Sequence, residues 1–288
     1  MFSRRRFVGS AVATAAVLAA DAAAFSKATE RPIGVQLYTV RSLVQNDLPG
    51  TLAAIHKIGY KNVETFVAEY KMSAKDLRSA ILDAGLAVPS AHFGYGTLES
   101  SFDYAKELGV ECIVCSMIPK SVAHSVDGYK RAAEQYNKWG EQAKKMGMQF
   151  GFHNHDVEFL PYGGVTGFDV LMRYTDPTLV RWQMDCYWVA EAGHDPVAML
   201  LRYGHRMLSL HLKDRKPNVP VSYDTGPKAA HFTEVGAGTL DWVSIFRLAA
   251  KDDIHYMFVE QDRTERPPLE CLQISYTNIA KLMKEALA

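Results

Sequence analysis

The sequence predicts a single α/β domain of the (β/α)8 barrel type. Short runs rich in β-branched and aromatic residues alternate with longer amphipathic stretches from residue 31 onward. Eight such units in about 260 residues match this barrel in both count and size. A doubly wound open sheet is the competing fold, but Gly34-Val35-Gln36-Leu37-Tyr38 is not the glycine-rich phosphate loop that such a sheet usually carries after its first strand.

The strands and helices are expected in strict alternation. Strands are expected at 33–38, 62–66, 87–92, 112–117, 148–153, 180–185, 207–212 and 256–260. Helices are expected at 48–58, 74–84, 98–108, 126–146, 168–174, 196–203, 241–250 and 269–287. Four helical patterns are closed by a glycine one to three residues before a strand, at Gly59, Gly85, Gly109 and Gly147. Glycine suits this place because it has no Cβ to clash in the left-handed conformation. The irregular segment 215–238 is expected to be a loop at the active site.

The first 24 residues are expected to be an export signal rather than part of the barrel. Arg4-Arg5-Arg6-Phe7 precedes a short apolar run, and Ala22-Ala23-Ala24 offers a site for cleavage. The adjacent arginines resemble the twin-arginine type of signal. The apolar run is well short of the ~20 residues that span a bilayer. We therefore expect a signal at 1–24, a barrel at 25–288, a periplasmic or otherwise exported protein, and no membrane attachment after cleavage.

Composition excludes several classes of protein. The 32 Lys and Arg residues balance 32 Asp and Glu residues, so net charge gives no reason to expect nucleic acid as a partner. Hydrophobic residues at 48% and charged residues at 22% are typical of a globular domain. Four cysteines are too few for a disulfide scaffold. Cys112 and Cys115 would point to opposite faces of one strand, so we expect buried thiols there.

Ionisable side chains end most of the expected strands. They are Glu64, His92, His153 with His155, Asp185, His211 and Glu260. The C-terminal strand ends of such a barrel form the mouth that carries the chemistry. Carboxylates and imidazoles gathered there would be costly to desolvate unless they were paired or held a cation. Two histidines and two carboxylates suit a divalent ion such as Mn²⁺, Co²⁺, Zn²⁺ or Fe²⁺. Asn154, Lys213 and Asp214 are expected to support these ligands.

Five motifs at the strand ends resemble one family. They are Gly34-Val35-Gln36-Leu37-Tyr38-Thr39-Val40-Arg41, Gly151-Phe152-His153-Asn154-His155-Asp156, Met184-Asp185, Leu210-His211-Leu212-Lys213-Asp214 and Val259-Glu260. In order and placement they resemble the sugar phosphate isomerase/epimerase superfamily, the xylose isomerase-like TIM barrels. The resemblance covers essentially the whole chain after residue 24. It implies one divalent metal ion (Mn, Co, Zn, Fe or Mg) held here by His153, Asp185, His211 and Glu260.

Strand five departs from the pattern of this superfamily. Its epimerases commonly have Glu, in a Glu-Asn-His run, where this sequence has His153. Two opposed glutamates are what allow a proton to leave one face of a sugar carbon and return to the other. His155 has the same strand parity as His153, so either is a candidate ligand with the other as the base, and Glu158 is a third candidate.

These features predict a metal-dependent carbohydrate isomerase, epimerase or lyase. The ion would stabilise an enediolate, and Glu260, His153 or His155 would remove the proton next to the carbonyl, with Lys213 as a further catalytic candidate. Reprotonation would give isomerisation or epimerisation. Expulsion of a β-oxygen would give a dehydratase like inosose dehydratase, or a keto-glycoside lyase. The histidine at strand five favours the second outcome.

The expected substrate is an unphosphorylated sugar or glycoside, because an exported enzyme seldom meets sugar phosphates. The residues expected to bind it are Gln36, Tyr38, Glu64, His92 and Trp188, the last by stacking on the apolar face of a sugar. The sequence leaves homo-oligomer formation open. Two rival functions are a barrel nuclease, which would need about three metals and a basic surface, and a non-catalytic sugar-binding protein. Candidates at all four metal positions argue against the second.

Overall fold

Eight parallel strands close into a barrel in a computed structural model that describes residues 31–66, 70–223 and 231–288. The order around the barrel is β1-β12-β9-β8-β5-β4-β3-β2. The strands are β1 (Ile33–Gln36), β2 (Asn62–Phe66), β3 (Ala87–Phe93), β4 (Cys112–Cys115), β5 (Gln149–His153), β8 (Val180–Asp185), β9 (Met207–Leu212) and β12 (Tyr256–Val259). The predicted fold is confirmed, and the expected signal at 1–24 lies outside the described residues.

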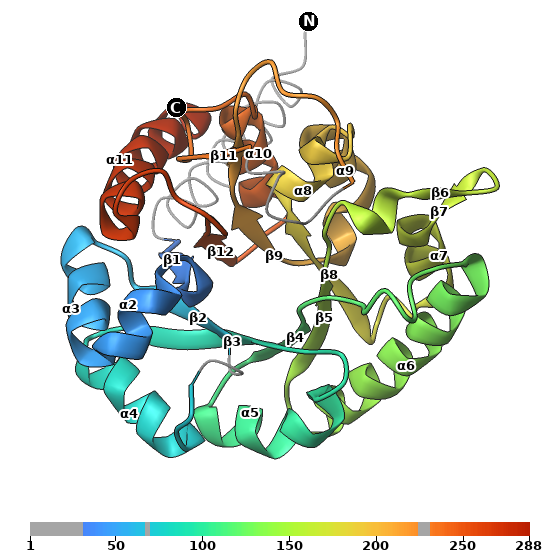
Figure 1. Ribbon diagram of the computed structural model, residues 1–288, viewed down its shortest axis with the longest axis horizontal. Coiled ribbons are helices and arrows are strands. Elements are labelled where there is room, and N and C mark those ends of the chain that lie inside the picture. The colour runs from blue at the N-terminus through green and yellow to red at the C-terminus, as the bar shows by residue number, and fades with distance from the viewer. Residues whose placement is uncertain (1–30, 67–69, 224–230) are drawn as a thin grey trace, which may run out of the picture.

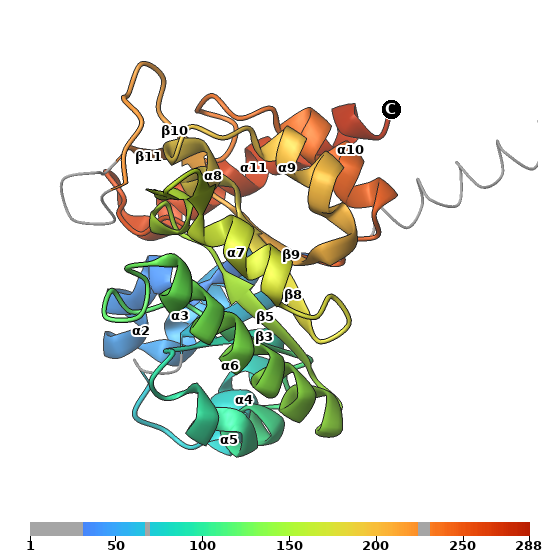
Figure 2. The same ribbon diagram turned by 90° about the vertical axis from the view of Figure 1, so that its right-hand side faces the viewer.

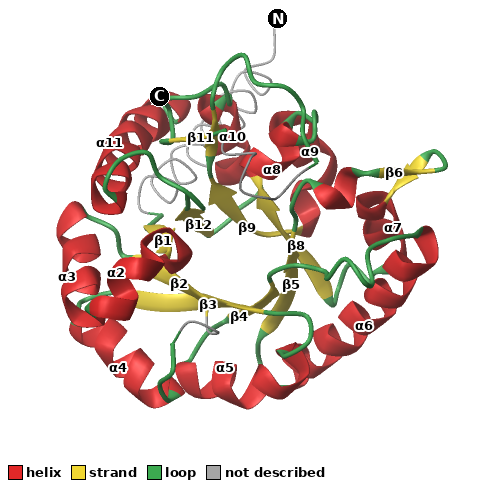
Figure 3. Cartoon of the chain, viewed as in Figure 1, coloured by secondary structure: helices red, strands yellow, loops and turns green. Residues whose placement is uncertain are grey.

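The helices form a ring around the strands (Figures 1 and 3). They are α2 (Arg41–Asn46), α3 (Leu48–Ile58), α4 (Ala74–Asp83), α5 (Phe102–Leu108), α6 (Val126–Lys145), α7 (Gly167–Tyr174), α8 (Cys186–Glu191), α9 (Pro196–Tyr203), α10 (Trp242–Lys251) and α11 (Pro268–Ala286). Single 3-10 turns are η1 (Leu37–Val40), η3 (Leu98–Ser101), η4 (Val157–Phe159) and η5 (Gly204–Arg206). Within the described ranges, no helix combines the length and the apolar character needed to cross a membrane.

Local sequence signals fix where the helices begin and end. Asp47 caps α3 by accepting a hydrogen bond from Gly50 N, and Thr166 and Asp169 form a reciprocal capping box at the start of α7. Gly109 ends α5 with a left-handed φ of 84°. A Cβ at Gly109 would be strained in that conformation, which is why this position favours glycine.

Two small antiparallel sheets lie outside the barrel wall. β6 (Pro161–Tyr162) pairs with β7 (Val165–Thr166) in a hairpin that projects from the body, and β10 (Asp214–Arg215) pairs with β11 (Phe232–Thr233). In the side view, β10, β11, α8 and α2 gather at one end of the barrel (Figure 2). That end is the mouth, because α2 and α8 follow the C-terminal ends of β1 and β8.

The two cysteines of β4 face opposite sides of the barrel wall, as predicted. Cys115 belongs to the main core between strands and helices, where Tyr136 of α6 donates a hydrogen bond to its sulfur. Cys112 belongs to a separate apolar cluster with Val114 and Leu208. Both are free thiols, and burial raises their pKa values, so neither is a reactive thiolate.

Candidate metal centre and active site

A cavity of about 220 Å³ opens at the mouth of the barrel. Its lining residues are Gln36, Tyr38, Phe66, His92, Ser116, Met117, His153, His155, Trp188, Lys213, Glu260 and Asp262. Eight of these are residues expected from the sequence to bind substrate, metal or a proton. Pockets for drug-sized ligands are about 300–1,000 Å³, so this cavity suits a smaller molecule.

Glu64 lies beneath the cavity and is the centre of a buried polar network. Its carboxylate is fully buried and does not line the cavity. It accepts hydrogen bonds from Gln36 Nε2 at 2.8 Å, Ser90 Oγ at 2.5 Å, Gln183 Nε2 at 2.8 Å and His211 Nε2 at 2.6 Å, and His92 Nε2 lies 3.1 Å away. Burial alone would raise the pKa of Glu64, but its interactions with His92 and His211 lower it well below the usual value. Glu64 is therefore an anion held by the barrel interior.

The four residues expected to hold a metal ion converge just above this network. Asp185, His211 and Glu260 each offer a ligand atom within 4.8 Å of the others. His211 Nδ1 is 2.8 Å from Glu260 Oε2 and 3.9 Å from Asp185 Oδ2, and His153 Nε2 is 3.6 Å from Asp185 Oδ2. Asp185 Oδ2 is buried and accepts no well-formed hydrogen bond. This oxygen lies within 4 Å of two imidazole nitrogens and of Lys213 Nζ. A carboxylate oxygen beside two imidazoles matches the ligand types that a divalent cation binds.

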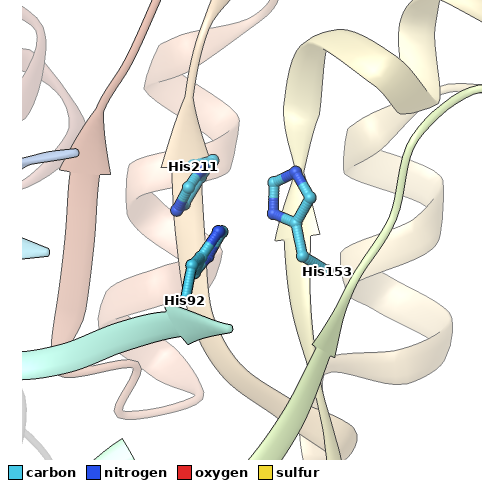
Figure 4. A group of neighbouring side chains, drawn as sticks. All are labelled: His92, His153 and His211. Atoms are coloured by element: carbon cyan, nitrogen blue, oxygen red, sulfur yellow. The ribbon is translucent and has the colours of Figure 1, made fainter. Parts of the chain in front are cut away.

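His92, His153 and His211 form a second group whose nitrogen atoms lie close together (Figure 4). The rings of His92 and His211 stack with a 2° angle between their planes, and the ring of His153 faces both. His92 Nε2, His153 Nδ1 and His211 Nε2 are all engaged with oxygen atoms of Glu64 or Gln183. Each of these nitrogens faces a protein oxygen at hydrogen-bond distance, which leaves His153 Nε2 and His211 Nδ1 as the nitrogens nearest Asp185.

Lys213 brings a buried positive charge to the same place. Its Nζ lies 3.0 Å from Asp185 Oδ2, 2.8 Å from Glu260 Oε2 and 2.6 Å from Asp262 Oδ1. Burial lowers the pKa of Lys213, but these three carboxylates outweigh burial and raise it well above the usual value. In the opposite sense, Lys213 and His211 lower the pKa of Glu260 despite its burial. Asp262 was not predicted, although it has the same strand parity as Glu260.

His155 lies at the cavity but outside the ligand cluster. Its ring is 5.0 Å from that of His153 and 5.4 Å from that of Trp188, and its Nδ1 is buried without a hydrogen bond. Burial, reinforced by the charge of Lys213, lowers the pKa of His155 to about 3, so the ring is neutral. Glu158 turns away from the cavity and accepts a hydrogen bond from His155 N at 2.7 Å. In the described part of the chain, the ligand groups contain His153 and neither His155 nor Glu158.

Asn154 and Asp214 support the site in different ways. Asn154 Oδ1 accepts hydrogen bonds from Asp185 N and from Trp182 Nε1, each at 2.9 Å, so it fixes the backbone of a predicted ligand. Asp185 Oδ1 then caps α8 through Trp188 N, which leaves Oδ2 to the site. Asp214 was expected beside the ligands but instead binds the loop that leads to α10.

The carboxylate of Asp214 accepts hydrogen bonds from six N–H groups. They belong to the backbone of Arg215, Gly236, Gly238, Thr239 and Leu240 and to the indole of Trp242. Its carboxylate is fully buried. Trp188, expected to stack on a sugar, does line the cavity, but its side chain is only 2% exposed and packs against Tyr187 and Phe232.

A closed parallel barrel with imidazoles and carboxylates converging at its mouth defines a class, the (β/α)8 barrels with a candidate site for a divalent cation at the C-terminal strand ends. The chain belongs to the xylose isomerase-like TIM barrel family, whose model matches residues 52–282. The resemblance seen in the sequence motifs is confirmed at this level.

Relatives and solved structures give the same family. An inosose dehydratase of Clostridium botulinum (strain Alaska E43 / Type E3) is 27% identical over 266 residues, covering 78% of this chain and 86% of that protein. A crystal structure of a sugar phosphate isomerase/epimerase from Parabacteroides distasonis ATCC 8503 superposes with a TM-score of 0.73 and 25% identity, covering 88% of this chain and 96% of that one. The IOLI protein, solved with a bound zinc atom, has the same fold, with a TM-score of 0.67 at 14% identity and coverage of 88% and 98%. The prediction of an enzyme on this scaffold is confirmed.

Proposed function

We propose that this protein is a divalent-metal-dependent lyase that removes water from a keto-sugar or keto-polyol, as an inosose dehydratase does. The observation that carries the proposal is that the cavity is lined both by an imidazole outside the ligand cluster, His155, whose pKa burial lowers, and by a buried ammonium, Lys213. Elimination needs a base at the carbon next to the carbonyl and positive charge near the departing hydroxyl. The likeness to curated inosose dehydratases supports the same reaction.

The proposed ligands are His153 Nε2, Asp185 Oδ2, His211 Nδ1 and Glu260 Oε2. Their donor chemistry fits, because two imidazoles and two carboxylates suit Mn²⁺, Co²⁺, Zn²⁺ or Fe²⁺. The spacing of 2.8–3.9 Å among the measured pairs fits ligands about 2.0–2.2 Å from a common ion. Such an ion supplies Lewis-acid polarisation of a substrate carbonyl.

The remaining cavity residues have separate proposed roles. His155 removes the proton next to the carbonyl, because His153 and Glu260 are already occupied by the cluster. Lys213 stabilises negative charge on the oxygen that leaves. Trp188 and Tyr38 line the cavity and present apolar ring surface to the carbon skeleton. Gln36 and His92 offer polar atoms to hydroxyl groups.

An isomerase or epimerase remains the second candidate, since a solved relative carries that name. The arrangement of carboxylates favours elimination instead. Among the described residues that line the cavity, Glu260 is the one glutamate, and the position expected to oppose it holds His153. A glutamate opposed by an imidazole lacks the symmetry that reversible proton transfer on two faces would use.

The test is ¹H NMR of the metal-loaded protein in D₂O with a panel of keto-polyols and keto-sugars that includes inosose. Loss of a hydroxyl group with formation of an unsaturated or dicarbonyl product is expected. Asp185→Asn should lose both the bound ion, measured by elemental analysis, and the activity. His155→Phe should slow the reaction by roughly 10²–10⁴-fold, the usual contribution of a general base.

The matched control is His255→Phe, because His255 is exposed at the start of β12. Deuterium entering the substrate without loss of a group would replace the lyase by an isomerase or epimerase. Calorimetric binding of a sugar with neither exchange nor product would indicate a non-catalytic binding protein. Full metal content in the Asp185→Asn protein would refute the ligand assignment.

We also propose that residues 1–24 direct export of the enzyme to the periplasm. The support is the arginine cluster followed by a short apolar run and small residues. Cell fractionation of the full chain should place it outside the cytoplasm. Changing Arg4, Arg5 and Arg6 to lysine should retain it inside, and unchanged export of that variant would contradict a twin-arginine signal.

A further inference from the structure

Gln183 is a buried amide that no motif singled out, and it lies between the polar network and the ligand cluster. It is fully buried on β8, two residues before Asp185. Its Oε1 is 2.6 Å from His92 Nε2 and 3.0 Å from His153 Nδ1. Its Nε2 is 2.8 Å from Glu64 Oε1 and 2.8 Å from Ser209 Oγ. An amide has two donor and two acceptor positions, and all four are used here.

The direction of this amide follows from its neighbours. Glu64 already accepts hydrogen bonds from several donors, so it is an anion and can only accept. The NH₂ group of Gln183 must therefore face Glu64, and Oε1 must face the two histidines. The reversed amide would put two acceptor oxygens 2.8 Å apart in a buried site, which is strongly unfavourable.

The direction of the amide then decides which nitrogen of each ring carries the proton that faces it. Oε1 can only accept, so His92 must carry its proton on Nε2 and His153 must carry its proton on Nδ1. The nitrogen that remains without a proton is Nδ1 in His92 and Nε2 in His153. His153 Nε2 is the atom 3.6 Å from Asp185 Oδ2, and His92 lines the cavity.

We propose that Gln183 is the positioning residue that divides these two histidines between metal binding and substrate binding. One carbonyl oxygen sets opposite tautomers, so that His153 offers Nε2 to the cation and His92 offers Nδ1 to a hydroxyl group in the cavity. Free imidazole carries its proton on either nitrogen, so without this oxygen the ring of His153 would populate both forms, while His92 would keep the contact of its Nε2 with Glu64 Oε2 at 3.1 Å. The inference rests on the proposed metal centre and is independent of the reaction proposed for it.

The experiment compares three variants of the full chain with the unchanged protein. Gln183→Met removes the oxygen and keeps most of the volume. Gln183→Glu loses the NH₂ group, and beside the anionic Glu64 its carboxyl should stay protonated, so that its O–H donates to Glu64 and its C=O still accepts from the two histidines. Ser209→Ala removes one partner of the NH₂ group and leaves Oε1 in place. Long-range ¹H–¹⁵N spectra of histidine-labelled, chelator-treated protein at pH 8 report the tautomers, and calorimetry with Zn²⁺ or Mn²⁺ reports the affinity.

In the unchanged protein we expect the Nδ1–H form of His153 and the Nε2–H form of His92. In Gln183→Met the ring of His153 should become a mixture, whereas His92 should keep its proton on Nε2 because Glu64 Oε2 lies 3.1 Å from it. Metal affinity should fall about 10- to 100-fold, as it does when a group that orients a metal ligand is removed. Gln183→Glu and Ser209→Ala should keep both tautomers. Ser209→Ala should also keep the metal affinity within about threefold, because the oxygen that orients His153 remains.

Two results would overturn the assignment. One is an Nδ1–H form of His153 that persists in Gln183→Met, and the other is equal loss of metal affinity in Gln183→Met and Ser209→Ala. Either would reduce Gln183 to a packing residue. Should Gln183→Met fail to fold, Gln183→Glu decides, since a mixed tautomer there contradicts the inference. Failure of the unchanged protein to bind any divalent ion would instead refute the proposed metal centre, and the tautomer result would still stand.

Discussion

Two sets of buried carboxylates at the mouth of the barrel have opposite electrostatic states. Glu64, inside the barrel, is fully buried and anionic because several polar hydrogens converge on it. Asp156 and Glu158, in the turn after β5, are buried as well. Neither oxygen of Asp156 accepts a well-formed hydrogen bond, and Glu158 has one oxygen without a donor.

The pKa values record this difference. Burial raises the pKa of Glu158 to about 7, and burial together with the charge of Glu158 raises the pKa of Asp156 to about 7. The pKa of Glu64 is instead well below its usual value. Burial is therefore not what decides the charge of a carboxylate here. The decisive quantity is the number of donors and cations that the surrounding strands supply.

The largest expected effect comes from changing Glu64, the buried carboxylate that many hydrogen-bond donors surround. Glu64→Gln replaces an acceptor by a donor among five polar hydrogens, so at least one buried donor is left without a partner. We expect a loss of about 3–5 kcal/mol in the free energy of unfolding, measured by urea titration at pH 7.5 in the presence of chelator. Asp156→Asn is the comparison and should change this free energy by less than about 1 kcal/mol. A similar loss in both variants would remove the distinction.

A smaller effect of pH on stability is expected from Asp156 and Glu158, the buried carboxylates that have few hydrogen-bond donors. Raised folded-state pKa values mean that the folded protein keeps these protons, so the stabilisation is complete below pH 4 and is lost as pH rises through about 7. The double variant Asp156→Asn, Glu158→Gln should therefore gain stability relative to the unchanged protein as pH rises from 4 to 8. We expect a gain of about 2–3 kcal/mol over that range. Parallel curves of unfolding free energy against pH would show that both groups ionise normally.

The smallest expected effect concerns Lys213, whose ammonium group is a positive charge already present beside the proposed metal ligands. Lys213 Nζ contacts two proposed metal ligands, Asp185 and Glu260, and so competes with a metal ion for their charge. Lys213→Met should bind Mn²⁺ about tenfold more tightly, a change of about 1.4 kcal/mol. Lys216→Met, which removes a lysine paired with Glu265 nearer the surface, is the control and should leave the affinity unchanged. Weaker binding by the Lys213 variant would mean that the ammonium supports the ion instead of opposing it.

The strands and the long helices were predictable from the sequence because each has a regular pattern of hydrophobic residues and a residue that marks its end. The expected strand 62–66 and the expected helix 48–58 coincide with β2 and α3. The short helix α8 was missed, because its six residues directly follow a strand and are nearly all buried, so no amphipathic pattern separates it from the strand.

The rim of the site was predictable, whereas its floor was not, apart from Glu64 on β2. His92, Asp185 and His211 end strands, where a polar residue after an apolar run stands out. Their support comes from Ser90, Gln183 and Ser209, each two residues earlier on the same inward face. A polar residue two positions before the end of a strand can be recognised in the sequence. Its hydrogen-bond partner cannot, because that partner lies on another strand that comes near only when the barrel closes.

The six hydrogen bonds of Asp214 have a consequence for how this enzyme can be altered. They fix the start of β10 and the approach to α10, while β10–β11 pairing joins both ends of the intervening segment. A new sequence between residues 216 and 231 would therefore begin and end on anchored backbone, and added length costs little entropy once the ends are held. Changes of sequence there should leave the barrel and the proposed metal ligands in place.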